Sequence, residues 1–510
     1  MTSRPNAWAT CRSADLVASS WRARIAARWC ASARLGQARW LATTVRRATD
    51  GVFRGLTDGR LPMPWIEAFR QQQQQKQNQK QTEGRPQERD LSTPRRMSDS
   101  YHRVVLPLGQ DPWLSDTYIN SSGHIRLGTI FMDLDARKLP KYSVRSLLTL
   151  VTNPRPPGTG HPAVSGVIVY KHTGPGVTTV TAALDRITIA HPLTDICDLE
   201  YSGQVTYASG RSSVEITCRV ARARPQGEPA RPEDELLTCT FTMVALDPDT
   251  KKPVNIPALV CDTPQEEAIF TAGQAKSLAK KKMSKTSLLA AEPDDPESAL
   301  IHAIWLRQLR YHDPNDTLRQ PANLVPMSTT QLSTAAIMQP QYRNRHQTMI
   351  FGGFHLKQTF ELAFCCAASF AHARPTFISA DPCTFRNPVP VGSVLYLHAT
   401  VAYTDPPLLE EGGSEPQHRD PEKPVTRVHV RVDSKVRDVE HDTTTKSTGQ
   451  FNYTFSVPKD VKVMPHTYQE YMMYIDARRR VKLGDIQSRQ ERSNSIDQQM
   501  HLAEDTNLTE

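Results

Sequence analysis

The sequence lacks two features that would each have pointed to a class of protein. No uninterrupted apolar run approaches the about 20 residues of a membrane helix, so we expect no integral membrane segment. The nine cysteines include no Cys-x-x-Cys pair and no Cys/His spacing suited to zinc. We therefore predict buried free thiols and no metal site.

A basic folded region is also missing, although the whole chain carries a net charge of +9. Residues 1–96 contain 18 Lys and Arg against 7 Asp and Glu, a net of +11, which leaves −2 for the remaining residues. Nucleic acid is bound through clustered Lys and Arg side chains that face its phosphates. We therefore expect no nucleic-acid partner, and an RNA-associated mitochondrial protein is supported only by the basic N-terminus.

The N-terminal residues have the composition of a targeting segment. Residues 1–48 contain nine Arg, no Lys and a single acid, Asp15, interleaved with Ala, Ser, Trp and Leu. This composition is typical of a mitochondrial presequence, with cleavage expected between Ala42 and Asp50; a disordered basic tail is the alternative. Residues 49–97 include the Gln-rich run 71–89, which has too little apolar surface to fold, and we interpret them as a disordered linker.

The rest of the chain repeats one pattern, a helix opened by glycine and followed by alternating strands. Gly128 precedes the helical segment TIFMDLDA, and Gly352 and Gly353 open a longer apolar helix that runs to about Ala371. Strand-like alternation follows over residues 178–246, with a hairpin turn at residues 208–211, and again over residues 375–457. The repeat predicts domains at residues 98–273 and 321–481, a connection at 274–320 and a disordered tail at 482–510.

One segment interrupts the repeat. TIFMDLDA is followed by residues 137–164, in which five prolines exclude a continuous helix, before SGVIVYKHTG resumes a helical pattern. An excursion from the middle of a buried helix leaves two helix ends in need of backbone partners. We hypothesise that residues 137–164 are a retained intron, which sequencing the transcript would test; a genuine loop insertion is the alternative.

Several stretches together resemble the mitochondrial two-domain hot-dog acyl-CoA thioesterases, in particular the fungal members. The resemblance covers residues 98–480 apart from the insertion, and it is carried by MSDSYHRVVLPL, DPWLSDTYIN, IRLGTIFMDLDA, YRNRHQTMIFGGF with TFELAFCCA, and HTYQEYMMYIDARRR. It implies an α+β protein of two tandem hot-dog domains, each an antiparallel sheet wrapped around one long central helix.

The same resemblance implies a function. A member of this family hydrolyses acyl-CoA to a fatty acid and free CoA in the mitochondrial matrix. CoA is then part of the substrate, and no separate cofactor is expected. The resemblance also predicts assembly into a homo-oligomer. A catalytically silent acyl-CoA-binding or assembly protein of the same fold is the alternative.

In related two-domain enzymes the site lies between the halves, where an acid on one central helix faces a polar residue ahead of the other helix. Asp135 stands seven residues after Gly128, at the place of the family's carboxylate. Phe360 holds the matching place after Gly353, so the second half lacks this acid. We therefore expect the two halves to form one composite site, although Asp135 could instead be an acid on the helix surface.

The polar loop before the second helix supplies the other candidate residues. Asn344, His346 and Gln347 stay open as partners of Asp135, because residues 347–349 occupy the place of the family's asparagine. A thioester is hydrolysed when a base takes a proton from water and hydrogen-bond donors stabilise the oxyanion. We expect Asp135 to be the base and Asn344 or Gln347 to orient the water.

Further residues are assigned to the substrate. We expect the N–H groups of Gly353 and Phe354 to hold the oxyanion, and we assign Gly352 to substrate binding. The basic side chains of Arg343, Arg345 and Lys357 are candidates to bind the CoA phosphates. For the loop histidine, the asparagine and the basic side chains, a purely structural or solvated role is the alternative.

Overall fold

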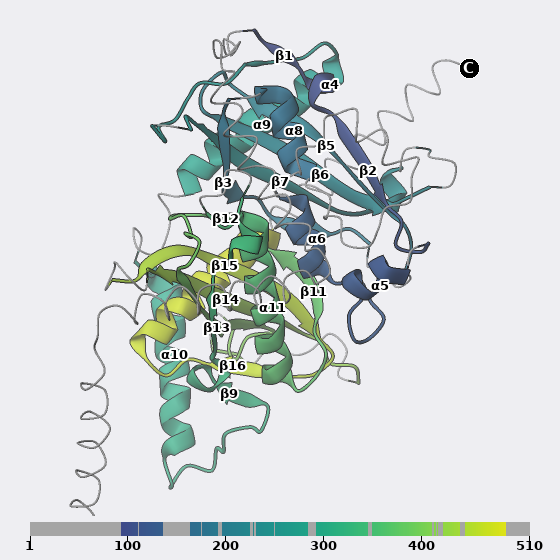
Figure 1. Cartoon of the computed structure of the whole chain (residues 1–510). Helices are drawn as coiled ribbons and strands as arrows, with labels where there is room; N and C mark the ends of the chain where they lie inside the picture. Colours follow the sequence, from purple (N-terminus) through teal and green to yellow (C-terminus); the bar gives the residue numbers. More distant parts are fainter. Residues whose placement is uncertain are drawn as a thin grey trace, which may run out of the picture. The chain divides into compact units, whose positions relative to one another are not determined.

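The computed structural model (Figure 1) describes residues 93–485, apart from residues 111, 136–163, 175, 192–195, 225–227, 229–230, 249, 284–291, 345–348, 411–412, 415, 417–421 and 439–443. All of these residues belong to one compact unit. The predicted presequence and most of the predicted linker lie outside the described residues, as does the insertion except for Val164. The predicted tail lies outside them after residue 485.

The first half of the fold begins with short elements and then forms a sheet. Its helices are α4 (Met97–Ser100), α5 (Pro112–Tyr118), α6 (Leu127–Leu134) and α8 (Val164–Thr173), with the 3-10 turn η2 (Pro232–Asp234). Its strands are β1 (Arg95–Arg96), β2 (His102–Leu106), β3 (Thr178–Leu184), β4 (Ile187–Ile189), β5 (Leu199–Ala208), β6 (Ser213–Arg222), β7 (Glu235–Leu246) and β8 (Leu259–Val260).

Two boundaries in this half differ from the prediction. β1 pairs with β8 and Met97 is fully buried, so the fold begins before Ser98 because these residues already have partners in it. Val164, which we assigned to the insertion, is the fully buried first residue of α8. The hairpin predicted at residues 208–211 is present, since β5 and β6 pair antiparallel on either side of it.

Two helices precede the second half. These are α9 (Pro264–Met283) and α10 (Asp295–His312), and they occupy much of the predicted connection. α9 packs on β5, where the Phe270 ring lies 5.0 Å from the Tyr207 ring. A capping box at Asp294 and Glu297 starts α10. The connection is therefore largely helical in the part of the chain that the structure describes.

The second half repeats the element order of the first. Its central helix is α11 (Gly352–Ala371), its 3-10 turns are η3 (Met327–Thr330) and η4 (Pro340–Tyr342), and a further helix covers residues 468–485. Its strands are β9 (Leu324–Pro326), β10 (Leu332–Ile337), β11 (Thr376–Ala380), β12 (Cys383–Thr384), β13 (Val394–Asp405), β14 (Thr426–Arg437), β15 (Lys446–Val457) and β16 (Lys462–Met464).

Equivalent positions in the two halves make equivalent hydrogen bonds, which supports the repeat inferred from sequence. Ser100 donates to the Met97 carbonyl at 2.7 Å, and Thr330 donates to the Met327 carbonyl at 2.8 Å. Each hydroxyl also accepts a backbone N–H, from β5 in the first half and from β13 in the second. The same small motif thus fixes the start of each half against its own sheet.

One 12-stranded sheet runs through both halves. Its main path is β10-β13-β14-β15-β11-β4-β7-β6-β5-β2, and β3 and β12 pair with each other beside it. The halves join through two antiparallel pairs, β11 with β4 and β12 with β3. This is a mixed α+β architecture with a long antiparallel sheet, and none of its described helices is long and apolar enough to cross a membrane.

The central helices lie against the sheet and against each other. α11 runs along β13, β14 and β15, and it packs on α6 (Figure 1). An aromatic cluster fills the space between them, in which the Phe131 and Phe360 rings lie 5.2 Å apart and Phe377 touches both. α11 is one continuous helix, as predicted, because its apolar positions recur on the buried face.

Candidate active site

Asp135 lies where α6 ends. The helix stops at Leu134, and Asp135 is its C-cap residue, with extended backbone angles φ −91° and ψ 174°. We had placed this carboxylate inside a helix, so the structure corrects that prediction. The side chain is 0% exposed and points toward the other half.

Two hydrogen bonds from different elements hold the Asp135 carboxylate. Thr181 of β3 donates its hydroxyl to Oδ1 at 2.6 Å, and the backbone N–H of Gly353 donates to Oδ2 at 2.5 Å. Hydrogen bonds to an ionised acceptor are about twice as strong as neutral ones. The Gly353 N–H, which we expected at a substrate carbonyl, is therefore engaged by Asp135 in this structure.

The two glycines make this contact sterically feasible. A Cβ atom added at Gly353 would lie 2.8 Å from both the Asp135 Cβ and the Met132 carbonyl oxygen. A Cβ added at Gly352 would lie 2.9 Å from Asp135 Oδ2. Both distances are shorter than side chains tolerate, so only glycine at these two positions allows the start of α11 to come this close to Asp135.

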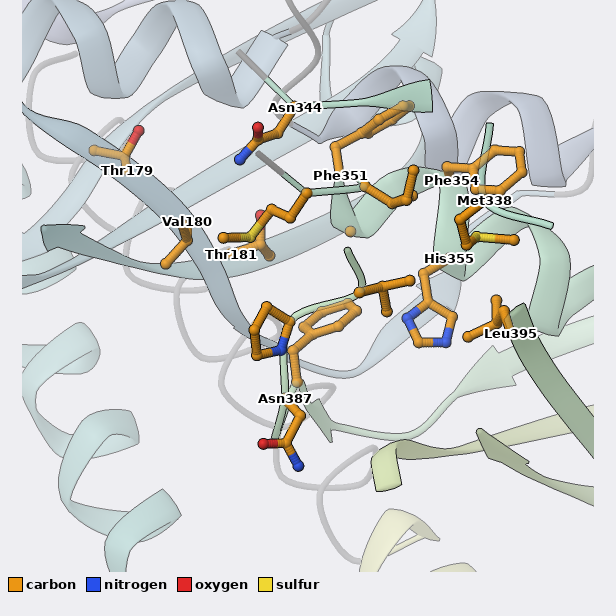
Figure 2. A pocket seen from close by; sticks show the side chains of 16 residues that line it. Thr179, Val180, Thr181, Met338, Asn344, Phe351, Phe354, His355, Asn387 and Leu395 are labelled. Atoms are coloured by element: carbon orange, nitrogen blue, oxygen red, sulfur yellow. The ribbon is translucent and has the colours of Figure 1, made fainter. Parts of the chain in front are cut away.

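A cavity of about 60 Å³ adjoins this hydrogen-bonded cluster. Its wall combines Thr181 from the first half with Asn344, Gly352 and His355 from the second (Figure 2). Asn344 is only 7% exposed. His346, Gln347 and Arg345 lie outside the described residues, so of the polar loop candidates the structure places Asn344 beside this cavity.

The loop before α11 is fixed by its own contacts. The Tyr342 and Phe354 rings stack at 3.9 Å, and the Phe351 N–H donates to the Tyr342 carbonyl at 3.3 Å. The Asn344 N–H donates to the Met349 carbonyl at 2.6 Å, which ties the two sides of the loop together. Phe354, one of the predicted oxyanion donors, therefore also anchors the loop through its side chain.

His355 is a polar residue of the cavity that sequence reasoning did not single out. Its Nε2 lies 2.6 Å from the Ser434 hydroxyl, which is in turn 2.6 Å from the Thr448 hydroxyl. Burial lowers the pKa of His355 to about 4. The imidazole is therefore neutral near pH 7 and offers a hydrogen bond rather than a charge.

The basic residues predicted to meet CoA are placed unevenly. Arg343 lies in the loop, where it forms an isolated β-bridge with Ile350. Lys357 lies against Gly128, with its Cγ 3.4 Å from the position of a Cβ added there, and it is not part of the wall of the cavity. A direct role for Lys357 at that cavity therefore has no support from the geometry.

A second buried carboxylate stands two residues before Asp135. Asp133 is 1% exposed and accepts a short hydrogen bond from the Tyr118 hydroxyl. Tyr118 is itself buried in the first half. Asp133 therefore belongs to the core of that half, and its contacts distinguish it from Asp135.

Comparison with known proteins identifies the family. No protein-family model matches the chain. It is 32% identical to the mitochondrial acyl-coenzyme A thioesterase 9 of Homo sapiens over 392 residues, which is 76% of this chain and 78% of that protein. It is 31% identical to the mitochondrial acyl-coenzyme A thioesterase 10 of Mus musculus over 407 residues, which is 78% of this chain and 80% of that protein. The chain belongs to the acyl-coenzyme A thioesterase family.

A solved structure similar to this thioesterase is the 12:0-ACP thioesterase from Umbellularia californica. The structural match spans 71% of this chain and 95% of the Umbellularia californica chain, with 11% sequence identity and a TM-score of 0.34.

The thioesterase fold joins residues that are distant in the sequence. It brings Asp135 to Gly352 and Gly353, and it sets Asn344 by the adjoining cavity. It also adds Thr181, which no motif marked, because only strand pairing carries β3 to this place. His355 was open to sequence inspection as a polar residue two positions after Gly353 on a buried helix.

Proposed function

We propose that this thioesterase hydrolyses acyl-CoA at one composite site between its two halves, with Asp135 as the general base. The observation that supports this most is the carboxylate itself, which comes from the first half and is held by Thr181 and by the first turn of α11. An ionised carboxylate is an acceptor at both of its oxygens, which is the property that a base for water needs.

The proposed chemistry needs no group other than protein and water. Asp135 takes a proton as the water oxygen attacks the thioester carbon, and the tetrahedral intermediate then breaks its C–S bond. The protonated Asp135 returns its proton to the departing CoA sulfur. The products are a fatty acid and CoA, and Asp135 is again ionised.

The roles around the carbonyl follow from the contacts of α11. Because the Gly353 N–H is bound to Asp135, we assign the oxyanion to the N–H groups of Gly352 and Phe354 at the same helix start. Asn344 orients the water, with His346 and Gln347 as the alternatives from the loop. Arg343 and Arg345 are the candidates for the CoA phosphates.

The location and the finer architecture are part of the same proposal. The relatives from Homo sapiens and Mus musculus are named as mitochondrial, and residues 1–48 have the composition of a presequence. We therefore propose a matrix enzyme made of two tandem hot-dog domains, in which α11 is one central helix and α6 with α8 forms the other. Assembly into a homo-oligomer stays a prediction.

The variant Asp135→Asn tests the proposed base. It keeps the shape of the side chain, and its amide can still bond Thr181 and the Gly353 N–H, so the fold should persist. Loss of a general base costs about 10²–10⁴ in rate, which release of CoA thiol from acyl-CoA would measure.

Asp133→Asn is the matched control. It neutralises the neighbouring buried carboxylate, which contacts Tyr118 rather than the proposed site, and its rate of thiol release should follow its folded fraction. If Asp135→Asn releases thiol at the unaltered rate, the assignment of the base is wrong.

One observation favours the catalytically silent alternative. Asp135 is 0% exposed and both of its oxygens already accept hydrogen bonds. A silent acyl-CoA-binding protein would bind acyl-CoA in equilibrium dialysis and release no thiol, whereas the enzyme releases thiol with turnover.

A further inference from the structure

A second and larger pocket lies at the start of α6. Its volume is about 730 Å³, within the range of about 300–1,000 Å³ that is usual for sites of small ligands. Arg126 and Gly128 from the start of α6 line it, together with Phe360 and Glu361 of α11 and Phe377 of β11. Like the first cavity, it takes its wall from both halves.

This pocket is the repeat counterpart of the proposed catalytic site. Gly128 opens α6 as Gly353 opens α11, and each glycine faces the residue seven positions after the other one. Gly353 touches Asp135, and Gly128 would meet Phe360 at 3.4 Å. The counterpart pocket therefore has a phenylalanine where the catalytic site has its carboxylate.

The partner of the carboxylate is replaced as well. The strand pairing of β3 shifts register between Thr181 and Ala183, and the pairing of β11 shifts register between Phe377 and Ser379. Phe377 thus corresponds to Thr181. The Asp135–Thr181 hydrogen bond of one site becomes an edge-to-face contact of the Phe360 and Phe377 rings, 5.3 Å apart, in the other.

The rim of this pocket carries charge over the aromatic floor. Arg126 pairs with Glu361 at 2.8 Å, so these two charges compensate each other. Arg374 is exposed on the same wall and has no ion-pair partner among the described residues. A net positive rim above an apolar floor suits a ligand with an apolar chain and an anionic head.

We propose that this pocket binds an acyl chain with an anionic head group, as an acyl-CoA or as a released fatty acid, and holds it without hydrolysis. Phe360 and Phe377 supply apolar contacts in place of a base, and Arg374 faces the anionic head. The inference rests on the proposed function only for the class of ligand. The pocket itself, and the presence of Phe360 and Phe377 at the places of Asp135 and Thr181, do not depend on the proposed function.

A thiol in the wall makes the pocket directly testable. Cys365 of α11 lines the pocket and is exposed. Its neighbour Cys366 is buried, and burial raises the pKa of that thiol to about 12, so Cys366 reacts little. Alkylation of the full chain, read for each cysteine by peptide mass spectrometry, would therefore report Cys365 separately, with Cys261 as the reference thiol.

The probes are S-hexadecyl-CoA, a thioether that cannot be hydrolysed, and palmitate. A ligand at about ten times its Kd leaves about a tenth of the sites empty, so alkylation of Cys365 should slow about tenfold while Cys261 is unaffected. Protection by both probes assigns the site to the acyl chain, and protection by the thioether alone assigns it to acyl-CoA. Unchanged alkylation of Cys365 with both probes overturns the proposal.

A charge variant and its control test the rim. Arg374→Glu should weaken the protection of Cys365 by palmitate, whereas Arg319→Glu changes the same charge at an exposed position that lines neither pocket and should not. Equal protection in Arg374→Glu and in the wild-type chain would refute the role of the rim.

Thiol release from palmitoyl-CoA, measured on the same samples, keeps the two proposals apart. Thiol release without protection of Cys365 from alkylation contradicts this inference alone. Protection of Cys365 without thiol release contradicts only the proposed hydrolysis.

Discussion

The two glycines that open the central helices should respond very differently to the same substitution. In Gly353→Ala the new Cβ would lie 2.8 Å from the Asp135 Cβ and 3.1 Å from the Met132 Cα, whereas non-bonded carbons prefer about 3.5–4.0 Å. In Gly128→Ala the new Cβ would lie 3.4 Å from the Phe360 ring and from the Lys357 Cγ, which is ordinary contact. The pair is therefore a matched comparison of one change in two helix starts.

The magnitude for Gly353→Ala follows from two costs. Overpacking of a core costs about 1–3 kcal/mol. Moving the Gly353 N–H away from Asp135 loses a hydrogen bond to a charged group, about 1.5–3 kcal/mol. We expect the free energy of unfolding to fall by the sum of the two, about 2.5–6 kcal/mol. Displacing Asp135 by about 1 Å should also lower the rate of thiol release by about 100-fold.

Gly128→Ala should change the free energy of unfolding by no more than about 1 kcal/mol, because the contacts are normal and alanine reduces the entropy of the unfolded chain. Urea unfolding and thiol release on both variants provide the measurement. Equal stability of the two variants, or wild-type activity in Gly353→Ala, would refute the reasoning that Gly353 is required for the approach of α6 and α11.

Two further predictions concern Thr181 and His355. Thr181→Val removes the hydroxyl that bonds Asp135 Oδ1, so kcat for thiol release should fall by about ten- to a hundredfold, and Thr181→Ser should restore most of it; equal activity of the valine and serine variants would contradict this role. The pKa of His355 is lowered by burial to about 4, below its unfolded value of about 6.5, so its contribution to stability is full above pH 6.5 and is lost as pH falls from 6.5 toward 4. In urea unfolding at pH 7, 6 and 5, the free energy of unfolding should fall by about 1 kcal/mol per pH unit more in the wild-type chain than in His355→Gln. Equal slopes would show that His355 takes up its proton at the same pH in the folded and unfolded chains.

Local patterns predicted much of this fold because they report residues near one another in the chain. The helical spacing of apolar residues located α11, and alternation located β5, β6, β7 and their second-half counterparts. The predictions that were wrong concern the ends of elements and the connection between the halves. Asp135 became a C-cap rather than a mid-helix residue, and α9 and α10 formed where a charged connection was expected, because capping and packing on β5 decide those segments.

The proposed composite site could be predicted only in part from the sequence. The spacing of Asp135 from Gly128, and the absence of an acid at Phe360, indicated that each half supplies what the other lacks. The partner of the carboxylate could not be found in this way. Thr181 reaches Asp135 because β3 pairs with β7 of its own half and with β12 of the other half, and neither pairing is written in the residues around position 181.

By itself, then, the sequence determined the family and the repeat of a glycine-opened helix with a sheet, and it led to the hypothesis that the base is Asp135 of the first half. Tertiary structure decided that the Gly353 N–H and the Thr181 hydroxyl both donate to Asp135, and that Phe360 and Phe377 line the counterpart pocket. The physical reason is that periodicity and spacing act within one element, whereas these contacts join residues from four elements. Only the packing of α6 on α11, the pairing of β3 with β12 and the pairing of β11 with β4 bring them together.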